Sequence, residues 1–219
     1  MRVIVGTRFK VSGVENIPAG GAIIAPKHQS AWDTFVLLPY VNDPVYILKR
    51  ELMWVPLFGW YVARMRMIPI DRGAREKAIA KVNDGAREEM AKGRQLIIYP
   101  EGTRRVPGAE PKYKSGIAYV YVETGMPVVP VAHNAGLFWP KTSFMRYPGT
   151  FELKFLPPIE PGLDRGAFME ALEIKLETAS DELLLEAVRA PNPPALSPVT
   201  QKRVDELEKA QAERYATMA

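Results

Sequence analysis

Residues 22–33 read Ala22-Ile23-Ile24-Ala25-Pro26-Lys27-His28-Gln29-Ser30-Ala31-Trp32-Asp33. The apolar run at residues 22–25 is typical of a short buried strand. The polar residues that follow, with Ser30 placed to cap a first turn, predict a helix over His28–Tyr40. A strand that leads directly into a helix is the repeating unit of an α/β protein.

The same alternation continues on both sides of this stretch. Further strands are expected at Val3–Val11, Val45–Leu48, Leu96–Tyr99, Pro127–Ala132 and Phe151–Leu156. Helices are expected at Arg75–Lys92, Lys114–Glu123 and Arg165–Val188, the first with one apolar stripe at helical spacing. The pattern predicts an α/β layer architecture and leaves the order of the strands open.

Composition narrows the possible functions. The 219 residues (24.5 kDa) are 47% hydrophobic and 25% charged, as in a globular domain. Lys and Arg exceed Asp and Glu by only 29 to 25, so no nucleic-acid partner is expected. Cysteine is absent and only two histidines are present, which argues against disulfides, a cysteine nucleophile and a metal centre.

The two ends of the chain differ from its body. Met1–Gly6 is too short to be the apolar core of a signal peptide, and no apolar run is long enough to span a bilayer. Residues 191–200 are rich in proline and predict an extended linker. Residues 201–219 then predict a polar helical tail, which leaves residues 1–190 as the single domain.

His28 and Asp33 form the first constellation with chemical meaning. On a regular helix, two residues five apart lie about 140° apart and face different sides. They meet only if His28 lies on the loop that enters the helix and Asp33 points back from its first turns. A carboxylate would then orient the imidazole so that its other nitrogen can take a proton. The alternative is an exposed histidine beside an aspartate that caps the helix.

A second constellation, Tyr99-Pro100-Glu101-Gly102-Thr103-Arg104-Arg105, follows an expected strand. Ligand sites of α/β sheets gather beyond the carboxyl ends of strands. Gly102 permits close backbone approach, while Thr103 and Arg104 offer donors for phosphate oxygens. A plain turn with two surface arginines is the alternative.

A third constellation joins basic and bulky apolar residues. Met67-Ile68-Pro69-Ile70-Asp71-Arg72-Gly73 places an arginine after an apolar run, and residues 49–77 hold seven basic against three acidic residues. Among them runs the apolar stretch 52–62, which includes Trp54 and Trp60. Cations beside aromatic residues favour an anionic membrane surface or an acyl chain as partner, whereas a core segment with charged flanks is the alternative.

Taken together, these motifs resemble those of the glycerolipid acyltransferases, and most of all the bacterial 1-acyl-sn-glycerol-3-phosphate acyltransferases. The resemblance spans Arg8 to Pro158. It rests on four stretches in order: Lys27-His28-Gln29-Ser30-Ala31-Trp32-Asp33, Ile68-Pro69-Ile70-Asp71-Arg72, Tyr99-Pro100-Glu101-Gly102-Thr103-Arg104 and Val128-Val129-Pro130-Val131-Ala132. The resemblance implies a mixed sheet flanked by helices.

The resemblance also implies roles for individual residues. His28 would be the general base and Asp33 its orienting partner. The acceptor phosphate would be bound through Arg72, Glu101, Gly102, Thr103, Arg104 and Lys114. Val128–Ala132 would line or support the acyl site, and His133, which follows this strand, is interpreted as structural. No cofactor or metal is implied.

The activity implied is direct acyl transfer from acyl-CoA or acyl carrier protein to the free sn-2 hydroxyl of the lysophospholipid 1-acyl-glycerol 3-phosphate, which gives phosphatidate. The same chemistry on glycerol 3-phosphate or a lyso-ornithine lipid is one alternative. A lipid hydrolase and a non-catalytic module that binds anionic lipids are others. Many relatives begin with a membrane helix that is not seen in this sequence, so we expect peripheral association with the cytoplasmic side of the inner membrane.

Overall fold

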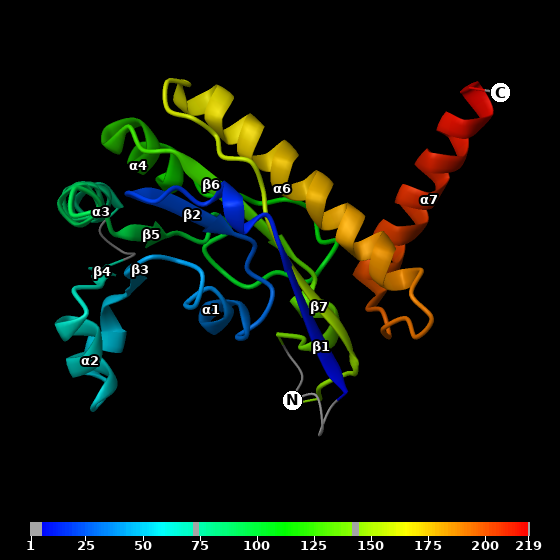
Figure 1. The fold of residues 1–219 in the computed structure, drawn as a ribbon, viewed down its shortest axis with the longest axis horizontal. Coiled ribbons are helices and arrows are strands. Elements are labelled where there is room, and N and C mark those ends of the chain that lie inside the picture. Colours follow the sequence, from blue (N-terminus) through cyan, green and yellow to red (C-terminus); the bar gives the residue numbers. More distant parts are fainter. Residues whose placement is uncertain (1–5, 72–74, 142–144, 219) are drawn as a thin grey trace.

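The computed structural model describes residues 6–71, 75–141 and 145–218. Its described part contains a mixed sheet of seven strands, in the order β1-β7-β6-β2-β5-β3-β4 (Figure 1). Neighbouring strands run parallel except for β6 and β7, which are antiparallel. The strands are β1 (Thr7–Ser12), β2 (Ala22–Pro26), β3 (Pro44–Lys49), β4 (Ile68–Ile70), β5 (Gln95–Ile97), β6 (Val128–His133) and β7 (Gly149–Phe155).

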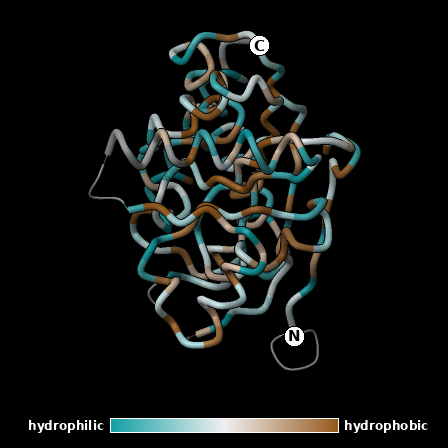
Figure 2. Tube along the Cα trace, turned by 90° about the vertical axis from the view of Figure 1, so that its left-hand side faces the viewer, coloured by the Kyte–Doolittle hydropathy of each residue, from teal (hydrophilic) through white to brown (hydrophobic). Residues whose placement is uncertain are grey.

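The central strands are continuous apolar runs because helices or turns cover both of their faces. Every residue of β2 and of β6 is buried. Successive residues point to opposite faces, so Ile23 packs with α3, α4 and α6, whereas Ile24 packs with Leu37 on the other side. In Figure 2, hydrophobic stretches cross the middle of the molecule, where these strands lie.

Helices cover the sheet unevenly. In Figure 1, α3, α4 and α6 lie along one face, whereas the short α1 lies on the opposite face. The helices are α1 (Asp33–Val36), α2 (Phe58–Arg64), α3 (Arg75–Met90), α4 (Gly116–Thr124), α5 (Ala135–Phe138), α6 (Arg165–Val188) and α7 (Pro198–Met218). Two 3-10 helices, η1 (Val14–Asn16) and η2 (Arg50–Trp54), complete the described elements. No helix in the described ranges combines the length and the hydropathy needed to cross a bilayer.

The predicted helix over His28–Tyr40 is wrong in extent, because α1 covers only Asp33–Val36. The carboxylate of Asp33 accepts hydrogen bonds from the amides of Gln29 and Ser30, at 2.8 and 2.9 Å. These bonds draw the amides of Gln29 and Ser30 back over the Asp33 carboxylate, so residues 27–31 form a loop before α1. Ser30 accepts the amide of Trp32 at 3.2 Å instead of capping α1.

The other predicted elements are present, most of them with shifted ends. The helix predicted at Arg165–Val188 has those bounds, and Val45–Leu48 lies within β3. The predicted opening strand is β1 at Thr7–Ser12, while residues 1–5 lie outside the described ranges. The strand β4 was not predicted, because a strand of three residues that contains Pro69 has little periodicity.

The C-terminal helix begins inside the stretch predicted to be a linker. Ser197 accepts the amide of Thr200 at 3.2 Å, so α7 starts at Pro198. Its first turns pack on the body of the protein, since Val204 is 2% exposed and joins the apolar cluster that includes α5 and the end of α6. Arg203 also forms two bonds with the carboxylate of Asp181 on α6.

Candidate active site

Three central strands end at the same edge of the sheet. In the registers of β6, β2 and β5, Pro26 lies opposite Val131 and Ile24 lies opposite Ile97. The residues that follow these strands therefore meet beyond their carboxyl ends, where parallel sheets place their ligand sites. His28, Glu101 and His133 all come from these exits.

His28 and Asp33 are in contact, as their spacing allowed if His28 lay on the entering loop. Nδ1 of His28 is 3.1 Å from Oδ1 and 3.2 Å from Oδ2 of Asp33. A carboxylate only accepts hydrogen bonds, so the ring proton belongs on Nδ1 and the lone pair on Nε2. The carboxylate is buried, whereas the His28 side chain is 20% exposed. The pair thus presents a basic nitrogen from an oriented ring.

Two tyrosines support this pair. The ring of Tyr99 lies against His28, with centroids 4.2 Å apart, and its hydroxyl donates to the carbonyl oxygen of Asp33 at 3.2 Å. The hydroxyl of Tyr46 donates to the carbonyl oxygen of Thr34 at 2.7 Å. Burial, together with the charge of Asp33, raises the pKa of both tyrosines, which keeps them as hydrogen-bond donors.

The surroundings of His133 fit the structural role expected from the sequence. It is completely buried, and its Nε2 lies 2.8 Å from the carbonyl oxygen of Lys27. Its Nδ1 accepts the amide of Ala135 at 3.3 Å, so the proton lies on Nε2. Burial lowers the pKa of His133 although the nearby charge of Asp33 opposes this shift. A neutral His133 therefore braces the loop that leaves β2.

The main chain of His28 is held from both sides by the Tyr99–Arg105 stretch. The amide of His28 donates to Oε2 of Glu101 at 2.8 Å, and its carbonyl oxygen accepts the amide of Arg105 at 2.7 Å. The Glu101 side chain is 1% exposed, and its other oxygen lies 2.8 Å from the ammonium of Lys27. Both oxygens of Glu101 are thus engaged within the protein.

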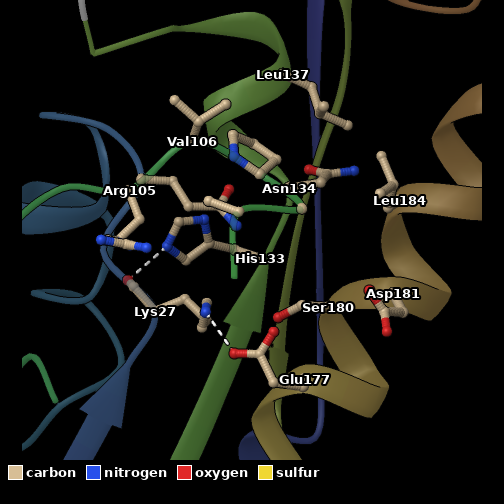
Figure 3. A pocket seen from close by; sticks show the side chains of 14 residues that line it. Lys27, Arg105, Val106, His133, Asn134, Leu137, Glu177, Ser180, Asp181 and Leu184 are labelled. Carbon is tan, nitrogen blue, oxygen red and sulfur yellow. Dashed lines mark hydrogen bonds and ion pairs between the residues drawn. The ribbon is translucent and has the colours of Figure 1, made fainter. Parts of the chain in front are cut away.

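Lys27 is the centre of a buried charge cluster that the sequence analysis missed. Its ammonium lies 2.8 Å from Glu101, 2.7 Å from Glu177 and 3.3 Å from the hydroxyl of Tyr113. Burial alone would lower the pKa of Lys27, but the two carboxylates raise it above its ordinary value, so the lysine is charged. Figure 3 shows Lys27 and Glu177 pointing toward each other beside a small cavity that His133 also lines.

Among the residues predicted to bind phosphate, Gly102 and Lys114 lie together. A Cβ placed on Gly102, whose φ is +66°, would be 3.5 Å from Cγ of Lys114. Thr103 and Lys114 are exposed and Arg104 is half-buried. Lys141, which was not predicted, adds a further cation because its ammonium donates to the carbonyl oxygen of Arg104 at 3.1 Å. Arg72 lies outside the described residues.

Comparison with known proteins finds the same family that the four motifs resemble. The profile of the family described as Acyltransferase matches residues 8–134. A 1-acyl-sn-glycerol-3-phosphate acyltransferase of Pseudomonas aeruginosa is 42% identical over 156 residues, which are 71% of this chain and 61% of that protein. One from Cocos nucifera is 32% identical over 159 residues, 72% of this chain and 51% of that protein.

A solved structure has a similar fold. The crystal structure of the 1-acyl-sn-glycerophosphate acyltransferase PlsC of Thermotoga maritima matches with a TM-score of 0.70 and 26% identity. The match covers 82% of this chain and 73% of that one. The chain spans 61% and 51% of the lengths of the two curated relatives. On the match to residues 8–134, this chain belongs to the acyltransferase family.

Proposed function

We propose that this protein transfers a fatty acyl group from an acyl thioester to the free sn-2 hydroxyl of 1-acyl-glycerol 3-phosphate, which gives phosphatidate. The observation that carries the proposal is the contact between Nδ1 of His28 and the buried carboxylate of Asp33. Because Nδ1 of His28 faces Asp33, Nε2 points away from Asp33 and is available to act as the base. The relatives named above as 1-acyl-sn-glycerol-3-phosphate acyltransferases support the choice of acceptor.

Nε2 of His28 takes the proton of the acceptor hydroxyl as its oxygen attacks the thioester carbonyl carbon. The tetrahedral intermediate then collapses with cleavage of the carbon–sulfur bond, and the thiolate recovers the proton from the imidazolium. General base catalysis of this type contributes about 10²–10⁴-fold. The Asp33 carboxylate stabilises the imidazolium that forms between the two steps.

The residues around Gly102 are suited to the acceptor phosphate. Thr103 can donate a hydroxyl hydrogen, Arg104 offers a planar fork of donors and Lys114 adds a point charge. We assign phosphate binding to these residues together with Arg72. Glu101 contributes differently, because its carboxylate holds Lys27 and the main chain of His28.

The donor is proposed to be acyl-CoA or acyl carrier protein, since both present the same thioester.

We propose that the protein acts at the cytoplasmic side of the inner membrane, to which it attaches peripherally. Side chains of η2, of α2 and of the turn between them support this attachment, because Trp54, Leu57 and Trp60 are 76, 86 and 72% exposed. Lys49, Arg50, Arg64 and Arg66, all exposed, flank them in sequence. Exposed aromatic residues beside cations suit an anionic membrane surface.

The proposed activity is tested by incubating the purified protein with oleoyl-CoA and lysophosphatidate, followed by mass spectrometry of the lipids. The wild type and the surface variant Glu182→Gln should form phosphatidate, whereas His28→Ala should form none above background. Release of free fatty acid without acceptor would indicate a hydrolase. Product only with glycerol 3-phosphate or a lyso-ornithine lipid would change the acceptor, and vesicle binding without any product would indicate a binding module.

A further inference from the structure

Glu177 lies on α6, outside the four motifs and outside the residues that the family profile matches. Its carboxylate nevertheless reaches the loops of the candidate active site, and its side chain is 18% exposed. Most neighbours of Glu177 on the inner side of α6 are apolar, and Leu172 and Leu176 are completely buried. A carboxylate directed into this region requires partners, because burying an unpaired charge is costly.

One series of contacts leads from Glu177 to the catalytic base. Oε1 of Glu177 is 2.7 Å from the ammonium of Lys27, which is 2.8 Å from Oε1 of Glu101. Oε2 of Glu101 in turn accepts the amide of His28 at 2.8 Å. Lys27 also directly precedes His28 in the chain. The position of the His28 main chain therefore depends on a lysine that is held between two carboxylates.

A second contact leads toward the acceptor. The hydroxyl of Tyr113 donates a short hydrogen bond to Oε1 of Glu177. Burial and the charge of Glu177 raise the pKa of Tyr113, so this hydroxyl keeps its proton. The next residue, Lys114, is a phosphate candidate whose amide donates to the carbonyl oxygen of Pro100 at 2.8 Å. Glu177 thus ties α6 to both loops.

We propose that Glu177 is a positioning residue for His28. Its charge balances Glu101 across the Lys27 ammonium. If the Glu177 charge is lost, Lys27 is attracted to Glu101 alone, and the carboxylate that holds the His28 amide moves with it. The Nε2 atom then approaches the acceptor hydroxyl in a poorer geometry. The catalytic part of this inference rests on the proposed function.

The test compares Glu177→Gln with Glu182→Gln, a matched change on the same helix that removes only an exposed ion pair with Lys154. Glu177→Gln should lower kcat by roughly tenfold to hundredfold, because small displacements of reacting groups are costly, while the KM for acyl thioester stays the same. The control should keep both constants.

A second measurement does not depend on activity. The chain has only two histidines, so the spectrum of protein with isotope-labelled histidine contains the signals of His28 and His133 alone. The ring signals of His28 should shift in Glu177→Gln and remain in place in Glu182→Gln. If both the His28 signals and kcat are unchanged in a folded Glu177→Gln, the positioning role is overturned, even if the melting temperature falls.

The two proposals fail in different ways. If the wild type forms no phosphatidate, the proposed function fails, while the histidine spectra still decide whether Glu177 controls His28. If Glu177→Gln does not fold, Tyr113→Phe replaces it, because this change loosens Glu177 without altering any charge. Tyr113→Phe should shift the His28 signals by a smaller amount, and an unchanged spectrum overturns the inference.

Discussion

Glu101 holds His28 by its main chain: Oε2 of the carboxylate accepts the amide of His28 at 2.8 Å, across 73 residues of sequence. The same carboxylate pairs with buried Lys27. Glu101 of the Tyr99–Arg104 motif and His28 of the Lys27–Asp33 motif are therefore one structural unit. The position of His28 depends on both stretches.

Glu101→Gln tests this relationship. The amide side chain can still accept one hydrogen bond, but it no longer balances the charge of Lys27. We therefore expect the free energy of unfolding to fall by about 1–3 kcal/mol. The kcat should fall while the KM of the acceptor changes little. Chemical denaturation and steady-state kinetics measure both effects. A large rise in KM with unchanged kcat would instead indicate direct contact between Glu101 and the acceptor.

Asp33→Asn tests the orientation of the imidazole. An amide NH₂ group turned toward Nδ1 favours the tautomer that carries its proton on Nε2, and that nitrogen can no longer accept one. Because a buried carboxylate also stabilises the imidazolium, we expect kcat to fall by about a thousandfold or more. Kinetics with the folded variant, verified by circular dichroism, provide the measurement. Activity within a few-fold of the wild type would exclude His28 as a base oriented by Asp33.

Lys114→Met tests the assignment of the acceptor phosphate. The loss of one exposed cation should raise the KM for lysophosphatidate by roughly tenfold and leave the KM for acyl thioester unchanged, since a charge-assisted contact is worth about 1.5–3 kcal/mol before screening by salt. Lys112→Met, an exposed lysine two residues away, is the matched control. Equal effects of the two variants would contradict a specific phosphate contact.

His133 predicts a pH dependence of stability. Burial lowers the pKa of His133 in the folded protein, whereas in the unfolded chain this pKa is near its ordinary value of 6.5, so the unfolded chain binds a proton more readily. The stabilisation that comes from keeping His133 neutral is complete above pH 6.5. It is lost as pH falls toward the folded pKa, by up to about 1.4 kcal/mol per pH unit. Unfolding free energies at about pH 7 and about pH 5.5 should therefore differ more for the wild type than for His133→Gln. An equal loss in both proteins would contradict this origin.

The surface of η2 and α2 predicts membrane attachment. Replacing both Trp54 and Trp60 with Ser should weaken binding to vesicles that contain anionic phospholipid by roughly tenfold or more, because aromatic side chains anchor at the interface. Tyr215→Ser, which removes an aromatic residue of similar exposure on α7, should have no effect. Sedimentation with vesicles measures binding, and added salt should weaken it in the wild type. Unchanged binding of the double variant would place the contact elsewhere.

Local sequence was sufficient for most of the secondary structure and for selecting His28 as the proposed base. Short apolar runs identified β2, β3 and β6, and helical spacing identified α3, because these signals depend on neighbouring residues. The spacing of His28 and Asp33 already limited how they could meet. The helix expected over His28–Tyr40 is shorter because the Asp33 carboxylate binds the amides of Gln29 and Ser30 and holds them in a loop before α1.

Tertiary structure alone decided the strand order and the partners of the buried charges. Nothing near Lys27 in sequence indicates Glu177, which is 150 residues away, and nothing near His28 indicates that Glu101 turns inward to its amide. Such contacts form because burial in the completed fold requires each charge to find a partner, whichever segment supplies it. The sequence therefore determined which groups are proposed to carry the chemistry, and the packing of α6 and the motif loops against the sheet determined how they are held.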